Sequence, residues 1–332
     1  MRLAWYALGG GLGHLQRALA VLRWLRPHLG AQAPLLLTSS AYAHLALAEG
    51  VPCVRLPGAH EAQALPDGVA AGLVAAALAA LGPLDCLVVD TFPEGLHDEL
   101  GAEVLAAAAF KVLVARPGGG TPETSPAWAC YDRVVAPLPE APWPGAEAVG
   151  WVLTRRPGEA LAAPDARLRL GLAPVGDRPL IAAMHAGDPG EVLGLFERVA
   201  AAAARLSEPH DLRLFTPLPL NGWLLDPRVV HPWPAGELLE AVDLLVSGGG
   251  YHSTAEAAAF GVRTLQVAFR RSHDDQATRL GQGPAVAQAS WGVAEWAEAL
   301  GAALAAPRPA PAPPAETDGA RRLALILAEA LR

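Results

Sequence analysis

The chain has 332 residues, enough for two α/β domains of ordinary size, each with its own core. Its formal net charge is −8 and neither half is basic, which argues against nucleic-acid binding and against more than weak peripheral contact with anionic lipid. Hydrophobic residues make up 52% of the chain and charged residues 17%, a composition typical of a folded globular protein.

The most membrane-like stretch, residues 69–81, is shorter than the ~18 residues of a spanning helix and predicts a buried helix instead. The N-terminal segment runs into glycines where a signal peptide would continue its apolar core. The cysteines Cys53, Cys86 and Cys130 lack the spacing of a zinc site or a disulfide framework. We therefore expect a cytoplasmic protein without a bound metal.

Short apolar runs alternate with longer stretches of helical period in the first half of the chain, which indicates parallel strands joined by helical crossovers. The predicted strands cover residues 3–8, 34–38, 53–56, 86–90, 111–115 and 133–136. The predicted helices between them include 14–28 and 96–109.

A stretch rich in proline, glycine and tryptophan at 137–157 breaks this pattern, and we place a boundary near Gly150 between domains 1–149 and 150–332. The second domain repeats the pattern with predicted strands at 180–184, 212–215, 229–231, 244–247 and 264–267 and a helix at 191–206. A Pro-rich connector, 307–314, leads to an amphipathic helix, 318–331, whose packing surface could belong to either domain. The predicted fold class is α/β, with two Rossmann-like domains facing a cleft.

The first predicted strand runs into Gly9-Gly10-Gly11-Leu12-Gly13-His14 and then a helix. Glycines there let the backbone approach a ligand, and a helix start favours an anion, so Gly11 and Gly13 are candidate binding positions. A tight turn without a ligand is the alternative. His14 lies at the sheet edge where α/β proteins bind ligands, and it can act as a general base; a capping or core histidine is the alternative.

The strand at 86–90 ends in Asp90, which we expect at the same sheet edge as His14. A carboxylate can hold the imidazole in one tautomer and stabilise its cation, so His14 and Asp90 are the predicted catalytic residues. Three further acids follow and are interpreted instead as the start of a helix: Glu94, Asp98 and Glu99.

A second glycine turn follows the strand at 244–247 and opens a helix. Bare backbone and hydroxyl groups at a helix start suit a diphosphate without a metal, and the residues concerned are Gly248, Gly249, Gly250, Ser253 and Thr254. Glu256 lies one turn further, where a carboxylate can accept hydrogen bonds from ribose hydroxyls; a solvated acid is the alternative.

After the next strand come Asp274, Asp275 and Gln276, which offer compact acceptors for sugar hydroxyls or else begin a solvated helix.

These motifs resemble the GT-B glycosyltransferases, and among them the family that includes MurG, which transfers N-acetylglucosamine. Gly9 to His14 followed by Arg17-Ala-Leu-Ala is similar to its GGTGGHxxPALA loop, and Ser247 to Gly261 is similar to its SGALTxxExxAxG segment. Asp274 to Gln276 is similar to its DxQ element. The resemblance implies a GT-B fold and transfer with inversion from a nucleotide-sugar donor, most simply a UDP-sugar, to a hydroxyl acceptor, with no cofactor besides that donor.

The resemblance also implies roles for particular residues. Glu256 matches the ribose-binding glutamate, Asp274 to Gln276 match the donor-sugar contacts, and Trp233 lies where the family holds the base. The chain departs from the family at Gln16-Arg17, where a proline is usual, and at His185-Ala-Gly-Asp-Pro-Gly, where a glycine-serine loop is usual.

Two alternatives remain open at this stage. The GxGHxxR pattern is also similar to nucleotide-sugar hydrolases of pseudaminate biosynthesis, in which the histidine activates water, and a hydrolase or epimerase would use the same donor site. A nucleotide-sugar-binding subunit without catalysis is the second alternative.

Overall fold

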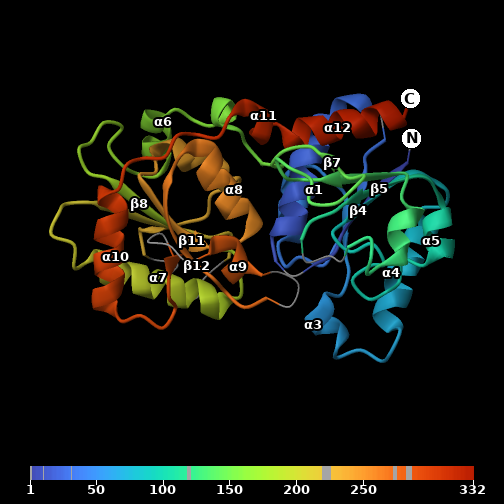
Figure 1. Cartoon of the computed structure of the whole chain (residues 1–332), viewed down its shortest axis with the longest axis horizontal. Helices are drawn as coiled ribbons and strands as arrows, with labels where there is room; N and C mark the ends of the chain where they lie inside the picture. The colour runs from blue at the N-terminus through green and yellow to red at the C-terminus, as the bar shows by residue number, and fades with distance from the viewer. Residues whose placement is uncertain are drawn as a thin grey trace. The chain divides into compact units, whose positions relative to one another are not determined.

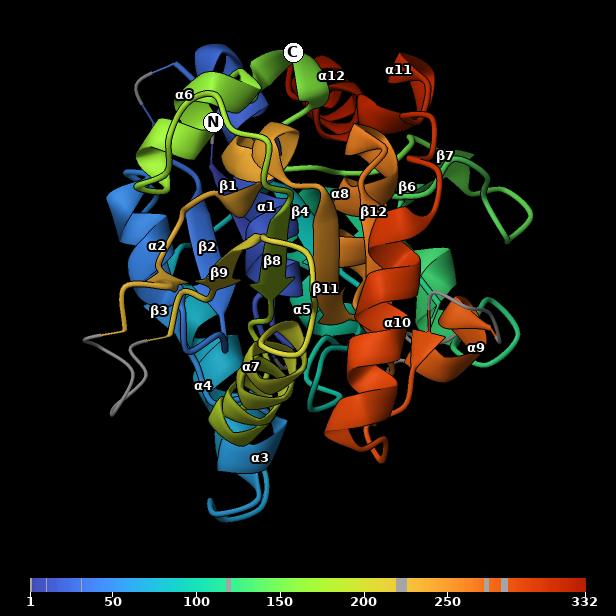
Figure 2. The same cartoon turned by 90° about the vertical axis from the view of Figure 1, so that its left-hand side faces the viewer.

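The computed structural model describes residues 2–9, 11–30, 32–117, 121–218, 226–271, 275–281 and 286–332. The chain divides into two compact units, Met1–Thr154 with Pro314–Arg332 and Arg155–Pro313. Each unit contains one parallel sheet with helices packed on it (Figures 1 and 2). The α/β fold class with two Rossmann-like sheets, predicted from the sequence, is confirmed.

The first unit has a seven-stranded sheet in the order β3-β2-β1-β4-β5-β6-β7. Its strands are β1 Leu3–Ala7, β2 Leu35–Thr38, β3 Cys53–Arg55, β4 Leu84–Asp90, β5 Ala108–Val114, β6 Arg133–Ala136 and β7 Glu147–Ala148. All pair in parallel. The strand order reverses between β1 and β4, which makes their carboxyl ends the switch point where such sheets bind ligands. Every residue of β1 is buried, as expected for a strand covered on both faces.

The first unit contains the helix predicted at 14–28, whereas the helix predicted at 96–109 is much shorter than expected. The helices of this unit are α1 Gly13–Leu25, η1 Arg26–His28, α2 Ala43–Ala48, α3 Ala59–Ala62, α4 Val69–Ala80, α5 Ala102–Ala106, η2 Pro126–Cys130, α11 Pro314–Thr317 and α12 Gly319–Ala330. The predicted helix at 96–109 was wrong, because the chain enters β5 at Ala108 and only α5 is helical. The stretch predicted as a buried helix, α4, buries only Ala70, Val74 and Leu78.

The final helix α12 belongs to the first unit, so its assignment to a second domain at 150–332 was wrong. Leu323 and Leu327 are fully buried, and the helix packs along α1 (Figure 1). The backbone of Trp151 donates to the Glu316 carbonyl, and Gly319 donates to the Trp151 carbonyl. The amphipathic face that the sequence shows therefore covers α1.

The second unit has a six-stranded parallel sheet in the order β10-β9-β8-β11-β12-β13. Its strands are β8 Leu180–Met184, β9 Asp211–Phe215, β10 Val229–Val230, β11 Leu244–Gly248, β12 Arg263–Val267 and β13 Val286–Ala287. Its helices are η3 Pro157–Glu159, α6 Ala163–Arg169, α7 Pro189–Ala203, η4 Ala235–Ala241, α8 Tyr251–Phe260, α9 Gln276–Leu280 and α10 Val293–Ala305. The order reverses between β8 and β11, which places a second switch point beside the Gly248 turn.

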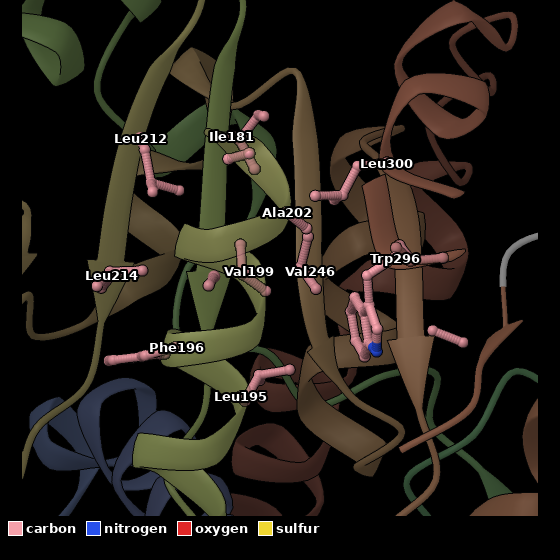
Figure 3. Close-up of a cluster of buried hydrophobic side chains, with 14 of the residues drawn as sticks. Ile181, Leu195, Phe196, Val199, Ala202, Leu212, Leu214, Val246, Trp296 and Leu300 are labelled. Atoms are coloured by element: carbon pink, nitrogen blue, oxygen red, sulfur yellow. The ribbon is translucent and has the colours of Figure 1, made fainter. Parts of the chain in front are cut away.

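The core of the second unit lies between its sheet and the helices α7 and α10. Phe196 and Val199 of α7 lie over β8 and β9, and Trp296 of α10 lies beside β11 and β12 (Figure 3). The N-terminus of α7 is capped by Asp188, whose side chain accepts a hydrogen bond from the Gly190 amide at 2.8 Å. No helix among the described residues is long and apolar enough to cross a bilayer.

Candidate functional site

The turn after β1 brings the backbone of Gly9 against the ring of His14. A Cβ atom at Gly9 would lie 2.3 Å from both Cδ2 and Nε2 of that ring, so only glycine fits there. Ser39, which follows β2, fixes the Gly9 backbone because its hydroxyl accepts from the Gly9 amide and donates to the Gly9 carbonyl, both at 2.8 Å. Gly11 has a φ of +105°, which favours glycine. The glycine-rich segment therefore allows the backbone to pack closely against the His14 ring.

His14 and Asp90 lie together, as the sequence predicts. His14 Nδ1 is 2.9 Å from Asp90 Oδ1, at the adjacent carboxyl ends of β1 and β4. Asp90 is fully buried and His14 is 6% exposed. The His14 ring also stacks on Phe92 at a centroid distance of 5.7 Å.

Arg17 completes this cluster, although no role was predicted for it from the sequence. Its Nε donates to Asp90 Oδ2 at 2.7 Å and its Nη2 to Asp90 Oδ1 at 2.8 Å. Arg17 lies one helical turn after His14 on α1, so both side chains reach the same carboxylate. The i, i+3 spacing of His14 and Arg17 on a predicted helix was the sequence pattern that could have indicated this contact. The Thr91 hydroxyl donates to Asp90 Oδ1 at 2.7 Å and accepts from Arg116 Nε at 3.3 Å.

The charges of this cluster fix the tautomer of His14. Burial alone would raise the pKa of Asp90, but the ion pairs with Arg17 and His14 hold that pKa well below its ordinary range. The carboxylate is therefore ionised and can only accept, so His14 Nδ1 donates to it. Burial lowers the pKa of His14; Asp90 opposes this effect, and Arg116 and Arg17 add to it. No described residue hydrogen-bonds to Nε2, which leaves its lone pair for a substrate proton.

Gly9→Ala tests how closely the His14 ring depends on the bare backbone. Because the new Cβ would overlap the ring, the imidazole must leave its place beside Asp90, and a displacement of about 1 Å can cost about a hundredfold in turnover. Steady-state kinetics measures the loss. Gly72→Ala is the matched control, since a Cβ on this exposed residue of α4 meets nothing within 4 Å. Unchanged kcat in Gly9→Ala would contradict the assignment.

In the second unit, hydrogen bonds from nearby residues of the same unit fix the turn after β11. The Ser253 hydroxyl donates to the Gly248 carbonyl at 2.8 Å, and Gln266 Nε2 donates to the Thr254 hydroxyl at 3.0 Å. The Gly249 amide donates to the Val267 carbonyl at 2.9 Å, so this amide is already paired, and a diphosphate contact of Gly249 stays a prediction. Helix amides also point out of the helix at Gly250 and the start of α8, and their binding of an anion stays a prediction.

Glu256 is 1% exposed, so a ribose reaches its carboxylate only if neighbouring residues move. The ribose-binding role of Glu256 stays a prediction. Asp275 is the N-cap of α9, and its side chain accepts from the Thr278 amide. Gln276 is buried, and its Oε1 accepts from the Phe269 amide at 3.0 Å. Both residues therefore lie at the start of a helix, with Gln276 buried instead of solvated, and their contact with a donor sugar stays a prediction.

Two further predicted contacts, those of Asp274 and Trp233, stay predictions. Asp274 lies outside the described residues. Trp233 precedes η4 and is half-buried, and its role in a base pocket stays a prediction. Among the described residues, no group of three or more histidine, cysteine, aspartate or glutamate side chains is placed to hold a metal ion.

Comparison with solved structures shows the fold that these two sheets define. The chain has the GT-B fold, and the matched structures over nearly its whole length are GT-B glycosyltransferases. No sequence-family model and no curated protein matches the chain.

Three of these structures represent the range. The glycosyltransferase SsfS6 of Streptomyces sp. SF2575 is 16% identical with a TM-score of 0.59, over 99% of this chain and 96% of that one. Acinetobacter baumannii MurG is 14% identical with a TM-score of 0.58, over 99% and 98%. The spinosyn rhamnosyltransferase SpnG, complexed with thymidine diphosphate, is 15% identical with a TM-score of 0.60, over 100% and 96%.

Proposed function

We propose that the chain is an inverting GT-B-type glycosyltransferase that moves a sugar from a nucleoside diphosphate sugar, in the first instance a UDP-sugar, to a hydroxyl acceptor. The observation that carries the proposal is the His14–Asp90 pair, with an ionised carboxylate on Nδ1 and no described partner on Nε2. Its support from the fold is that the matched structures are glycosyltransferases, one of which holds thymidine diphosphate.

In this mechanism His14 Nε2 takes the proton of the acceptor hydroxyl as its oxygen attacks the anomeric carbon. Asp90 stabilises the imidazolium that forms, and Arg17 and Thr91 hold the carboxylate in place. The bond from the anomeric carbon to the diphosphate breaks, and the leaving diphosphate carries the negative charge. Amides at Gly250 and the start of α8 stabilise that charge. A single in-line displacement inverts the anomeric centre.

The test is turnover of UDP-sugars and TDP-sugars with and without hydroxyl acceptors, followed by nucleotide release. The expected result is nucleotide release that needs an acceptor. The NMR signal of the anomeric proton should show that the configuration of the product is inverted relative to the donor. Rapid release with water alone identifies a hydrolase, and retained configuration rules out single displacement. Binding of nucleotide without any turnover favours a non-catalytic binding subunit.

The pH dependence follows from the burial of His14. A general base acts in its neutral form, and burial lowers the His14 pKa below the ordinary value of about 6.5. We therefore expect kcat/KM to stay level as pH falls from neutral through about 6.5 and to decline only in more acidic buffer. An acid limb at or above that ordinary value would contradict the assignment of His14. Reassay at neutral pH after each incubation separates titration from unfolding.

A further inference from the structure

A second histidine lies at the switch point of the other sheet, outside the roles assigned above. His185 directly follows β8, and its side chain is 10% exposed. Its ring stacks on Phe269, which follows β12, with a centroid distance of 4.5 Å and an interplanar angle of 18°. The ring is therefore fixed in plane between the ends of two strands.

Glu191 and Arg271 set the orientation of this ring. His185 Nε2 is 3.2 Å from Glu191 Oε2, and Arg271 donates to both oxygens of Glu191 at 2.6 Å. Although burial alone would raise it, the bonds from His185 and Arg271 lower the pKa of Glu191 to about 2. The carboxylate is ionised and only accepts, so Nε2 carries a proton and donates to it.

The opposite edge of the ring faces the Gly248 turn. A Cβ on Gly248 would lie 2.9 Å from His185 Cε1 and 3.0 Å from Nδ1, so the bare backbone is what lets the ring approach. Gly187 is equally crowded, with a Cβ position 2.5 Å from His185 Nε2. Among the described residues, Nδ1 has no hydrogen-bond partner although nine-tenths of the side chain is buried.

We propose that His185 binds the donor diphosphate. Its Nδ1 donates a hydrogen bond to a phosphate oxygen beside the Gly248 turn, while Nε2 donates to Glu191. The inference rests on the proposed function, because it assumes that the diphosphate of the donor binds at the start of α8. Hydrogen bonds from its two nitrogens then hold the ring between two anions, the Glu191 carboxylate and the phosphate. Arg271 stays paired with Glu191 and acts on the phosphate only through that carboxylate.

The experiment compares the affinities of UDP, TDP and uridine for the wild-type chain and for His185→Gln by calorimetry. We expect the variant to bind UDP and TDP about tenfold more weakly, the size of one lost charge-assisted hydrogen bond, and uridine equally well. His185→Phe keeps a ring to stack on Phe269 and should show the same selective loss. His210→Gln is the matched control, because His210 precedes β9 at the opposite edge of the sheet.

A double-mutant cycle with Gly248→Ala sharpens the test. If a Cβ on Gly248 acts by displacing the ring, Gly248→Ala weakens UDP binding in the wild-type background and adds little in the His185→Ala background. Additive losses, unchanged UDP affinity in His185→Gln, or an equal loss for uridine would each overturn the inference and leave the proposed function standing. A wild-type chain that binds neither nucleotide overturns the proposed function itself.

Discussion

Replacing His14 by alanine is expected to lower kcat by about 10² to 10⁴, the usual contribution of a general base. The variant leaves the second unit unchanged, so the KM for the donor sugar should stay within a few-fold of the wild-type value. Steady-state kinetics with saturating acceptor separates the two parameters. The loss belongs to kcat because the proton moves only as the acceptor oxygen attacks.

His28→Ala is the matched control for this experiment, because His28 lies exposed in η1 of the same unit. The two variants should have similar unfolding midpoints, since removing the His14 ring leaves Asp90 paired with Arg17. If His14→Ala turns over at the wild-type rate, the base is another residue and the proposed mechanism is wrong.

Asp90→Asn is expected to lower the free energy of unfolding by about 3 to 5 kcal/mol, the range for a buried ion pair that loses one partner. The side chain of Asp90 is fully buried and accepts both hydrogen bonds from Arg17, which is itself 1% exposed. An amide in its place carries no charge, so the buried guanidinium loses the negative charge of Asp90. Chemical denaturation followed by circular dichroism measures the change.

The role of Asp90 also predicts how the free energy of unfolding changes with pH. Because the folded-state pKa of Asp90 lies below its ordinary value of about 3.9, the carboxylate stabilises the fold above that pH, and the stabilisation is lost as pH falls further. Asp90→Asn should remove this acid dependence. Asp67→Asn, at an exposed position, is the control and should change neither quantity. Wild-type stability in Asp90→Asn would contradict the buried ion pair.

The sheets could be predicted because their central strands, such as β1, β4 and β11, are buried on both faces and therefore appear as short apolar runs. Leu180–Met184 and Arg133–Ala136 have the predicted bounds, and the other predicted strands differ by a few residues at their ends. The two-residue strands β7 and β13 were missed, whereas β10, which is equally short, was predicted at 229–231. The helix at 96–109 was wrong because β5 takes its last residues into the sheet.

The first candidate site could be predicted in part from topology. His14 and Asp90 follow strands whose carboxyl ends are adjacent, and the structure brings their side chains together. Arg17 was missed because partners for Asp90 were sought only at the sheet edge, not one turn along α1.

The second site is less predictable because the same residue types bind ligands and shape loops. Ser253 and Gln276 both hydrogen-bond to backbone groups of their own unit, which sequence spacing does not distinguish from donor contacts. His185 could be found only once β8 and β11 were known to be neighbours.

The return of α12 to the first unit has a consequence for synthesis on the ribosome. Domains usually fold as they emerge, beginning with the N-terminal one. Here residues 155–313 emerge before the segment 314–332 that covers α1, so the second unit has its whole sequence available while the first still lacks a packing partner. The nascent chain therefore exposes the apolar surface of α1 until translation has passed the second unit, and His14 is carried by the unit that is completed last.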